Sequence, residues 1–76
     1  MPVYQLAYAQ PRSANYSPKV PIWERRFHKF DAQDDFMAQG AANQFLDSTP
    51  VACGGRMYKP SQYRLSRVEG LQSVPL

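Results

Sequence analysis

Few residues in this chain could perform catalysis, and they lie far apart in the sequence. The chain holds a single histidine, His28, and a single cysteine, Cys53. A cysteine next to a histidine can act as a nucleophile with its base, and the amides of Gly54 and Gly55 could stabilise an oxyanion. Nothing in the sequence brings Cys53 and His28 together or supplies a third group to orient them. We therefore expect the protein not to be an enzyme.

The same shortage of reactive side chains argues against a metal site and a phosphate-binding loop. A structural zinc site needs several histidine or cysteine ligands at set spacings. The acidic residues Asp31, Asp34 and Asp35 do not follow the pattern of a calcium-binding loop and are better explained as capping a helix. The residues around Gly54 lack the lysine and hydroxyl ending of a phosphate-binding loop. We expect no metal and no cofactor.

Alternating aromatic and cationic residues favour a binding function instead. As a strand, Ile22–Phe30 would carry on one side Trp23, Arg25, Phe27 and Lys29. Aromatic rings stack on exposed bases and cations hold phosphates, so this side is a candidate nucleic-acid surface, with Arg64 on another strand. The alternative is that Trp23 and Phe27 belong to the core. The aromatic and basic pattern expected of an RRM sheet is absent from both strands.

Protein binding is the other reading of these residue types. Tyrosine, tryptophan and arginine are enriched at interface hot spots. The chain has such residues in the predicted strands and in Gln10–Pro21, a long proline-containing stretch that we expect to form an exposed loop. The candidate partner-binding residues are Arg12, Tyr16, Trp23, Arg25, Lys29, Arg64 and Arg67.

One helix is expected to support these strands. Asp31–Ser48 has a good N-cap in Asp31, further acidic residues in its first turn, and Pro50 just beyond its end. Glycine within a helix is costly, so we expect Gly40 to mark a close approach to a strand. At helical spacing, the side of the helix that we expect to face the core carries Phe36, Met37, Gly40, Ala41, Gln44 and Phe45, and Ala38 and Ala42 widen this stripe.

The strands are predicted on both sides of this helix. Val3–Ala9 alternates, Ile22–Phe30 follows with an uncertain register, and Ser61–Glu69 comes last. A bulge in the second strand could place both Phe27 and Phe30 inward. The predicted fold is a small single α+β domain of ββαβ type, with one amphipathic helix packed on an antiparallel sheet. The expected core is Tyr4, Leu6, Tyr8, Phe30, Met37, Ala41, Phe45, Leu65 and Val68.

Length and composition limit the possible classes of protein. A chain of 76 residues, with 43% hydrophobic and 20% charged residues, is expected to form one globular domain, 1–76, with a short tail at 70–76. No apolar run approaches the ~20 residues needed to span a bilayer, so we expect no membrane partner. A lone cysteine suits a reducing compartment, which makes the cytoplasm the expected location.

The charges are unevenly distributed along the chain. The formal net charge is +3 and the sequence pI is about 9.3. Most acidic residues lie in or beside the predicted helix, whereas all lysines and arginines lie outside it. If the helix covers one face of a sheet, the other face is basic and could meet nucleic acid or an acidic protein. The alternative is an ordinary solvated face of mixed charge.

The layout of the chain resembles that of small accessory proteins encoded by phages and mobile elements, anti-CRISPR proteins among them. An alternating strand (VYQLAY) precedes a second strand that runs into an acidic helix start (FHKFDAQDDF), and a closing strand (YRLSRVEG) follows. What this resemblance implies is a non-catalytic inhibitor that occupies a surface of a host nucleoprotein complex.

We therefore expect non-enzymatic binding to a protein or nucleoprotein partner, through the basic sheet face and the loop. Direct binding of RNA or single-stranded DNA is the alternative. A third possibility is a structural subunit of a larger assembly. The sequence identifies neither the partner nor the oligomeric state.

Overall fold

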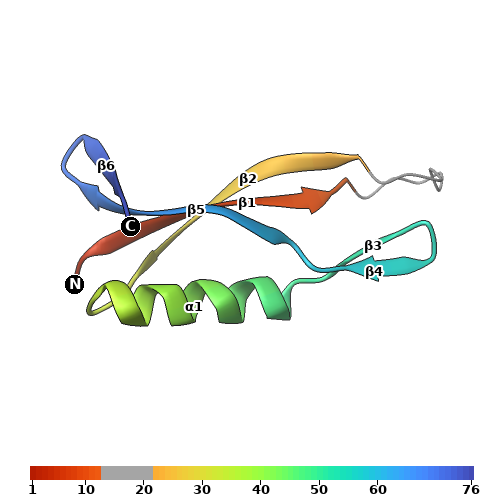
Figure 1. Ribbon diagram of the computed structural model, residues 1–76, viewed down its shortest axis with the longest axis horizontal. Helices are drawn as coiled ribbons and strands as arrows, with labels where there is room; N and C mark the ends of the chain where they lie inside the picture. The colour runs from red at the N-terminus through yellow and green to blue at the C-terminus, as the bar shows by residue number, and fades with distance from the viewer. Residues whose placement is uncertain (13–21) are drawn as a thin grey trace.

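Figure 1 shows the computed structural model, which describes residues 1–12 and 22–76. Within these ranges, one helix lies along one face of an antiparallel sheet, with strands before and after it. The α+β fold predicted from the sequence is confirmed. In chain order the elements are β1 (Val3–Pro11), β2 (Trp23–Asp31), α1 (Asp35–Ser48), β3 (Val51–Cys53), β4 (Arg56–Tyr58), β5 (Ser61–Glu69) and β6 (Gln72–Pro75).

The main sheet has four antiparallel strands in the order β2-β1-β5-β6. β1 is therefore a central strand, and β2 and β6 are the edges. β3 and β4 form a separate hairpin, whose turn holds Gly54 at φ 60° and Gly55 at φ 79°. Residues other than glycine rarely adopt this left-handed backbone conformation, which explains the glycine pair at this turn.

The core lies between α1 and one face of the sheet. Alternation along β1 turns Tyr4, Leu6 and Tyr8 toward the helix, as the sequence predicts, and all three are buried. Leu65 of β5 pairs with Leu6 and is 3% exposed. The helix adds Ala38, Ala42 and Leu46 to this cluster, and Ala32 completes it. Phe30 and Phe45 are partly buried and pack against the cluster.

The helix begins later than the sequence suggests. Its N-cap is Asp34, whose carboxylate accepts a hydrogen bond of 2.8 Å from the amide of Met37. The predicted cap, Asp31, is the last residue of β2 and pairs with Val3. Asp31 was therefore the wrong cap, because pairing with β1 keeps the chain extended through this position. Asp34, three residues further on, supplies the carboxylate that accepts an unpaired amide hydrogen of the first turn.

The helix faces the sheet with only part of the predicted side, the part that holds Ala38, Ala42 and Phe45. Its fully buried residues are Ala38 and Ala42, whereas Phe36 is 86% exposed, Met37 is 52% exposed and Ala41 is exposed. The prediction for these three residues was wrong. The tyrosine rings of β1 fill much of the space between the layers, and the two helix residues at 0% exposure are alanines, while Leu46 completes the core.

Gly40 does not mark a close approach to a strand. A Cβ built at this position would meet nothing within 4 Å. The glycine lies on the exposed side of α1, so the contact expected from the sequence is absent.

The strands differ from the prediction in several details. β2 pairs with β1 without a break, so Phe30 faces the helix while Phe27 faces away and is 65% exposed. The bulge occurs instead in the β1–β5 pairing, where Ala7 pairs with Arg64 and Tyr8 with Gln62. Val68, expected in the core, is half-buried and pairs with Val3 on the outer face.

The predicted loop and tail are partly ordered into strands. β1 continues through Pro11, so the predicted loop does not begin at Gln10, and the rest of that prediction, residues 13–21, lies outside the described ranges. The tail contributes β6, which pairs with β5 from Ser66 to Glu69. Gly70, at φ 63°, lies in the turn that joins the two strands.

Candidate functional site

The sheet face turned away from α1, here called the open face, carries the aromatic and cationic side chains singled out in β2. Strand alternation and pairing place residues from all four strands on it. They include Val3, Gln5, Ala7, Ala9, Trp23, Arg25, Phe27, Lys29, Asp31, Tyr63, Arg64, Ser66, Val68 and Ser73.

A hollow of about 190 Å³ lies in the middle of the open face. Its floor includes Ala7 of the central strand, which pairs with Phe27 on one side and with Arg64 on the other. A methyl side chain between two large ones leaves a depression at this point. The residues that line the hollow are Gln5, Ala7, Arg25, Phe27, Tyr63, Arg64, Ser66 and Ser73.

A cation and an aromatic ring contact each other across β1 at one end of this hollow. The guanidinium carbon of Arg25 lies 4.0 Å from the ring centroid of Tyr63. The bulge in β5 is what makes this possible, because it puts Tyr63 on the same face as Arg64. Simple alternation would have placed the two on opposite faces. Tyr63 remains 56% exposed, so one surface combines charge and aromatic area.

Three of the predicted partner-binding residues come together on the open face. Arg25 and Arg64 line the hollow, and Lys29 follows Phe27 along β2 on the same side. In the described part of the chain, none of these cations forms an ion pair with an acidic side chain. Their charges are therefore directed to solvent.

The other predicted site residues lie away from the hollow. Trp23 is on the same side of β2 as Arg25 by alternation, at the end of the strand where it pairs with Pro11. Trp23, 44% exposed, packs edge-on against Tyr58, with ring centroids 6.1 Å apart. Arg12 forms an ion pair of 3.5 Å with Glu24, which also pairs with Arg26 at 3.0 Å. The hydrogen bond from Arg26 lowers the pKa of the Glu24 carboxyl. The remaining prediction in this region, Tyr16, lies outside the described residues.

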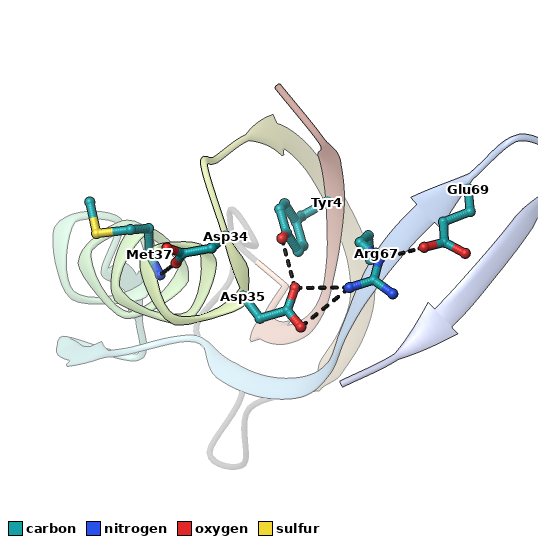
Figure 2. Close-up of polar contacts among 6 residues, drawn as sticks. All are labelled: Tyr4, Asp34, Asp35, Met37, Arg67 and Glu69. Atoms are coloured by element: carbon teal, nitrogen blue, oxygen red, sulfur yellow. Dashed lines mark hydrogen bonds and ion pairs between the residues drawn. The ribbon is translucent and has the colours of Figure 1, made fainter.

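Arg67 faces the helix, on the side of the sheet opposite Arg64. Figure 2 shows its guanidinium between Asp35 of α1 and Glu69 of its own strand. Arg67 Nε donates to Glu69 Oε1 at 2.6 Å, and Nη1 donates to both oxygens of Asp35 at 3.2 and 3.3 Å. The bond to Glu69 and the nearby carboxylate charges raise the pKa of Arg67. Its contacts join helix to sheet.

The residues considered for catalysis are engaged in packing. His28 stacks on Phe45, with ring centroids 4.1 Å apart and planes 4° from parallel. Cys53 is buried in β3 beside the hairpin turn, and among the described residues no hydrogen bond joins it to His28. Within ranges 1–12 and 22–76, no group of histidine, cysteine or acidic residues gathers in a way that could hold a metal ion.

Phe27 and Tyr63 line the hollow but are absent from the residues predicted to bind a partner. Alternation places Phe27 on the correct side of β2, but core packing is the alternative for its ring. Alternation along Ser61–Glu69 predicts Tyr63 on the side opposite Arg64, and the bulge that reorients it has no signature in the sequence. The small residue Ala7 between alternating large ones was the available signal for a depression.

Comparisons of the chain with protein-family models, with curated proteins and with solved structures find no match. In the part of the chain that the structure describes, no helix has the length and apolar character needed to cross a bilayer.

Proposed function

We propose that this protein is a non-enzymatic binding protein that occupies the surface of a protein or nucleoprotein partner through its open face. The observation that carries this proposal is a set of cations on the face of the aromatic hollow that form no ion pair within the described ranges: Arg25, Lys29 and Arg64. We place the protein in the cytoplasm, where its lone cysteine would stay reduced.

The distribution of ion pairs supports this choice of surface. Most cations elsewhere in the described ranges are matched by acids: Arg12 and Arg26 share Glu24, and Lys59 pairs with Asp47, while Arg56 of the hairpin has no ion pair. Arg67 is matched twice. On the open face the one acidic residue is Asp31, at the end of β2. An anionic partner would therefore find uncompensated positive charge on this face, which favours encounter and orientation.

The exposed rings add a reason for specific contact. Phe27 and Tyr63 are 65% and 56% exposed beside the hollow. Aromatic residues and arginine dominate the binding energy of many interfaces, chiefly when they surround a pocket that can be fully desolvated. A non-catalytic inhibitor, which the resemblance to phage-encoded accessory proteins implies, would need a surface of this kind and no reactive group.

The test is affinity capture from a bacterial lysate with the tagged protein and two charge-matched variants. The open-face variant carries Arg25→Ala, Lys29→Ala and Arg64→Ala. The control variant carries Arg12→Ala, Arg26→Ala and Arg56→Ala, so it loses the same formal charge from other exposed positions. Thermal unfolding of each purified variant confirms that it is folded.

We expect the open-face variant to lose at least 90% of the protein or nucleoprotein species captured by the parent, and the control variant to keep them. Treatment with nuclease then separates partners held through protein from those held through nucleic acid. Equal capture by the two variants would contradict the proposal, because it would assign binding to another surface or to net charge alone.

A further inference from the structure

We propose that the hollow on the open face holds an unpaired base of a single-stranded nucleic acid, with Phe27 as the stacking ring and with Arg64 and Lys29 at the phosphates. This inference rests on the proposed function, because it uses the same face. It goes further by naming the chemical class of the component that the face contacts.

Phe27 is the first reason. The sequence left open whether this ring belongs to the core, and the structure places it outside, at 65% exposure. Among the described residues, no other aromatic ring packs against it. A phenylalanine in this position offers a flat apolar surface to solvent. Every base has a π-face, so stacking on such a ring requires no particular sequence.

The contact between Arg25 and Tyr63 is the second reason. The guanidinium lies over the ring at 4.0 Å, and neither group is tied to a carboxylate in the described ranges. Guanidinium planes and aromatic rings are the two surfaces on which proteins stack single-stranded bases. The pair forms one wall of the hollow, opposite the end that is lined by serines.

The floor of the hollow supplies polar atoms at a depth that a base edge could reach. Gln5, Ser66 and Ser73 line it beside Ala7. Ser66 is 7% exposed, so its hydroxyl is recessed rather than free on the surface. Amide and hydroxyl groups can hydrogen-bond to the edge of a base that is not engaged in pairing. In a duplex these edges are paired and the faces are stacked, so we expect a preference for single strands.

The cations complete the site on either side. Arg64 pairs with Ala7 on β5, while Lys29 lies two residues beyond Phe27 on the opposite edge strand. A strand whose base enters the hollow would pass both side chains with its phosphates. An acidic protein segment would also satisfy these charges. It would not offer a flat ring to stack on Phe27, nor a base edge to hydrogen-bond with the polar floor.

The probe is a 12-nucleotide oligothymidylate with a fluorescent label, titrated with the full-length protein at low salt and followed by fluorescence anisotropy. The matched variants are Phe27→Ala and Phe36→Ala. Both remove an exposed phenylalanine, but Phe36 lies on α1, away from the open face. Arg64→Ala tests the phosphate contact, and a duplex of the same length tests the preference for single strands.

We expect Phe27→Ala to weaken oligothymidylate binding by about 5- to 150-fold, the range measured for loss of one stacked base. Phe36→Ala should leave the affinity unchanged. Arg64→Ala should weaken binding and reduce the slope of log affinity against log salt by about 0.7, the effect of one lost phosphate contact on a single strand. The duplex should bind at least tenfold more weakly.

The inference is overturned if no binding occurs up to about 100 μM protein at low salt, where even non-specific nucleic-acid binding is measurable. It is also overturned if Phe27→Ala and Phe36→Ala bind alike. If the oligonucleotide fails to bind while the open-face variant still loses its captured partner, the face contacts an acidic protein. The proposed function then stands without this inference. If both experiments fail, the open face is not a binding surface.

Discussion

Tyr4 of β1 and Asp35 of α1 lie 31 positions apart in the sequence, and a hydrogen bond of 2.7 Å joins them: the tyrosine hydroxyl donates to Asp35 Oδ1. Arg67 donates to the same carboxylate from β5 (Figure 2). One side chain at the start of the helix thus holds two central strands. These polar contacts therefore position the first turn of α1 over one end of β1 and β5. The packing of the core sets the distance between the helix and the sheet.

This network makes stability sensitive to alkaline pH. Burial and the bond to Asp35 raise the pKa of Tyr4 above its ordinary value of 10.0. The folded state therefore holds this proton more tightly than the unfolded chain. The contribution of the protonated Tyr4 hydroxyl to stability is complete below pH 10. It is lost as the pH rises through the raised pKa of Tyr4.

The Tyr4→Phe variant tests this dependence. We expect it to be less stable than the parent at neutral pH, and the difference between the two to shrink from pH 10 upward. Urea unfolding at a series of pH values measures both effects. A difference that stays constant across this range would show that the hydroxyl proton does not contribute in the way described.

The start of the helix gives a second prediction. Asp34 accepts the amide of Met37 at 2.8 Å, whereas Asp31 belongs to β2. Loss of an N-cap costs about 0.5–2 kcal/mol. We expect Asp34→Ala to lower the free energy of unfolding by this amount and Asp31→Ala to lower it by less. Chemical denaturation compares the two, and a larger loss for Asp31→Ala would restore the cap inferred from the sequence.

The buried side of α1 gives a third prediction. Ala42 is 0% exposed against the sheet, while its neighbour Ala41 is exposed. A larger side chain in a well-packed core costs about 1–3 kcal/mol, and surface substitutions usually change stability by less than about 0.5 kcal/mol. Ala42→Leu should therefore destabilise the protein and Ala41→Leu should not. The opposite order of unfolding midpoints would mean that the helix is rotated.

Gly40 gives a fourth prediction, in the stabilising direction. A Cβ at this position meets nothing within 4 Å, so an added methyl group would not clash. Glycine within a helix costs about 0.5–1 kcal/mol relative to alanine. Gly40→Ala should raise the free energy of unfolding by that amount, as read from the urea midpoint. A loss of stability would reveal that another part of the protein covers this site.

Much of the fold could be predicted from local patterns. The alternation around Leu6 predicts a half-buried strand, and that strand becomes the centre of the sheet with its predicted side inward. The run from Asp31 to Pro50 predicts a helix because capping and termination are local events, and the helix forms within it from Asp35 to Ser48. The placement of Phe27 and Lys29 on one side of β2 follows from the same period of two.

The rest depends on contacts between distant residues. The predicted stripe of α1 includes Phe36 and is widened by Ala38 and Ala42, and helical spacing alone does not select which part of it meets the sheet. In the structure Ala38, Ala42 and Leu46 are buried beside Tyr4 and Tyr8, whereas Phe36 is exposed. The hollow likewise depends on the β5 bulge, which appears only when β5 is paired with β1.

The central claim is that the open face contacts the partner, and site-specific photo-crosslinking tests it most directly. A photoreactive phenylalanine analogue replaces either Phe27 on the open face or Phe36 on α1, two residues of the same type that are both exposed. After irradiation in a bacterial lysate, we predict crosslinked partner from position 27 and none from position 36. Crosslinks from position 36 with none from position 27 would contradict the account and assign binding to the helix side.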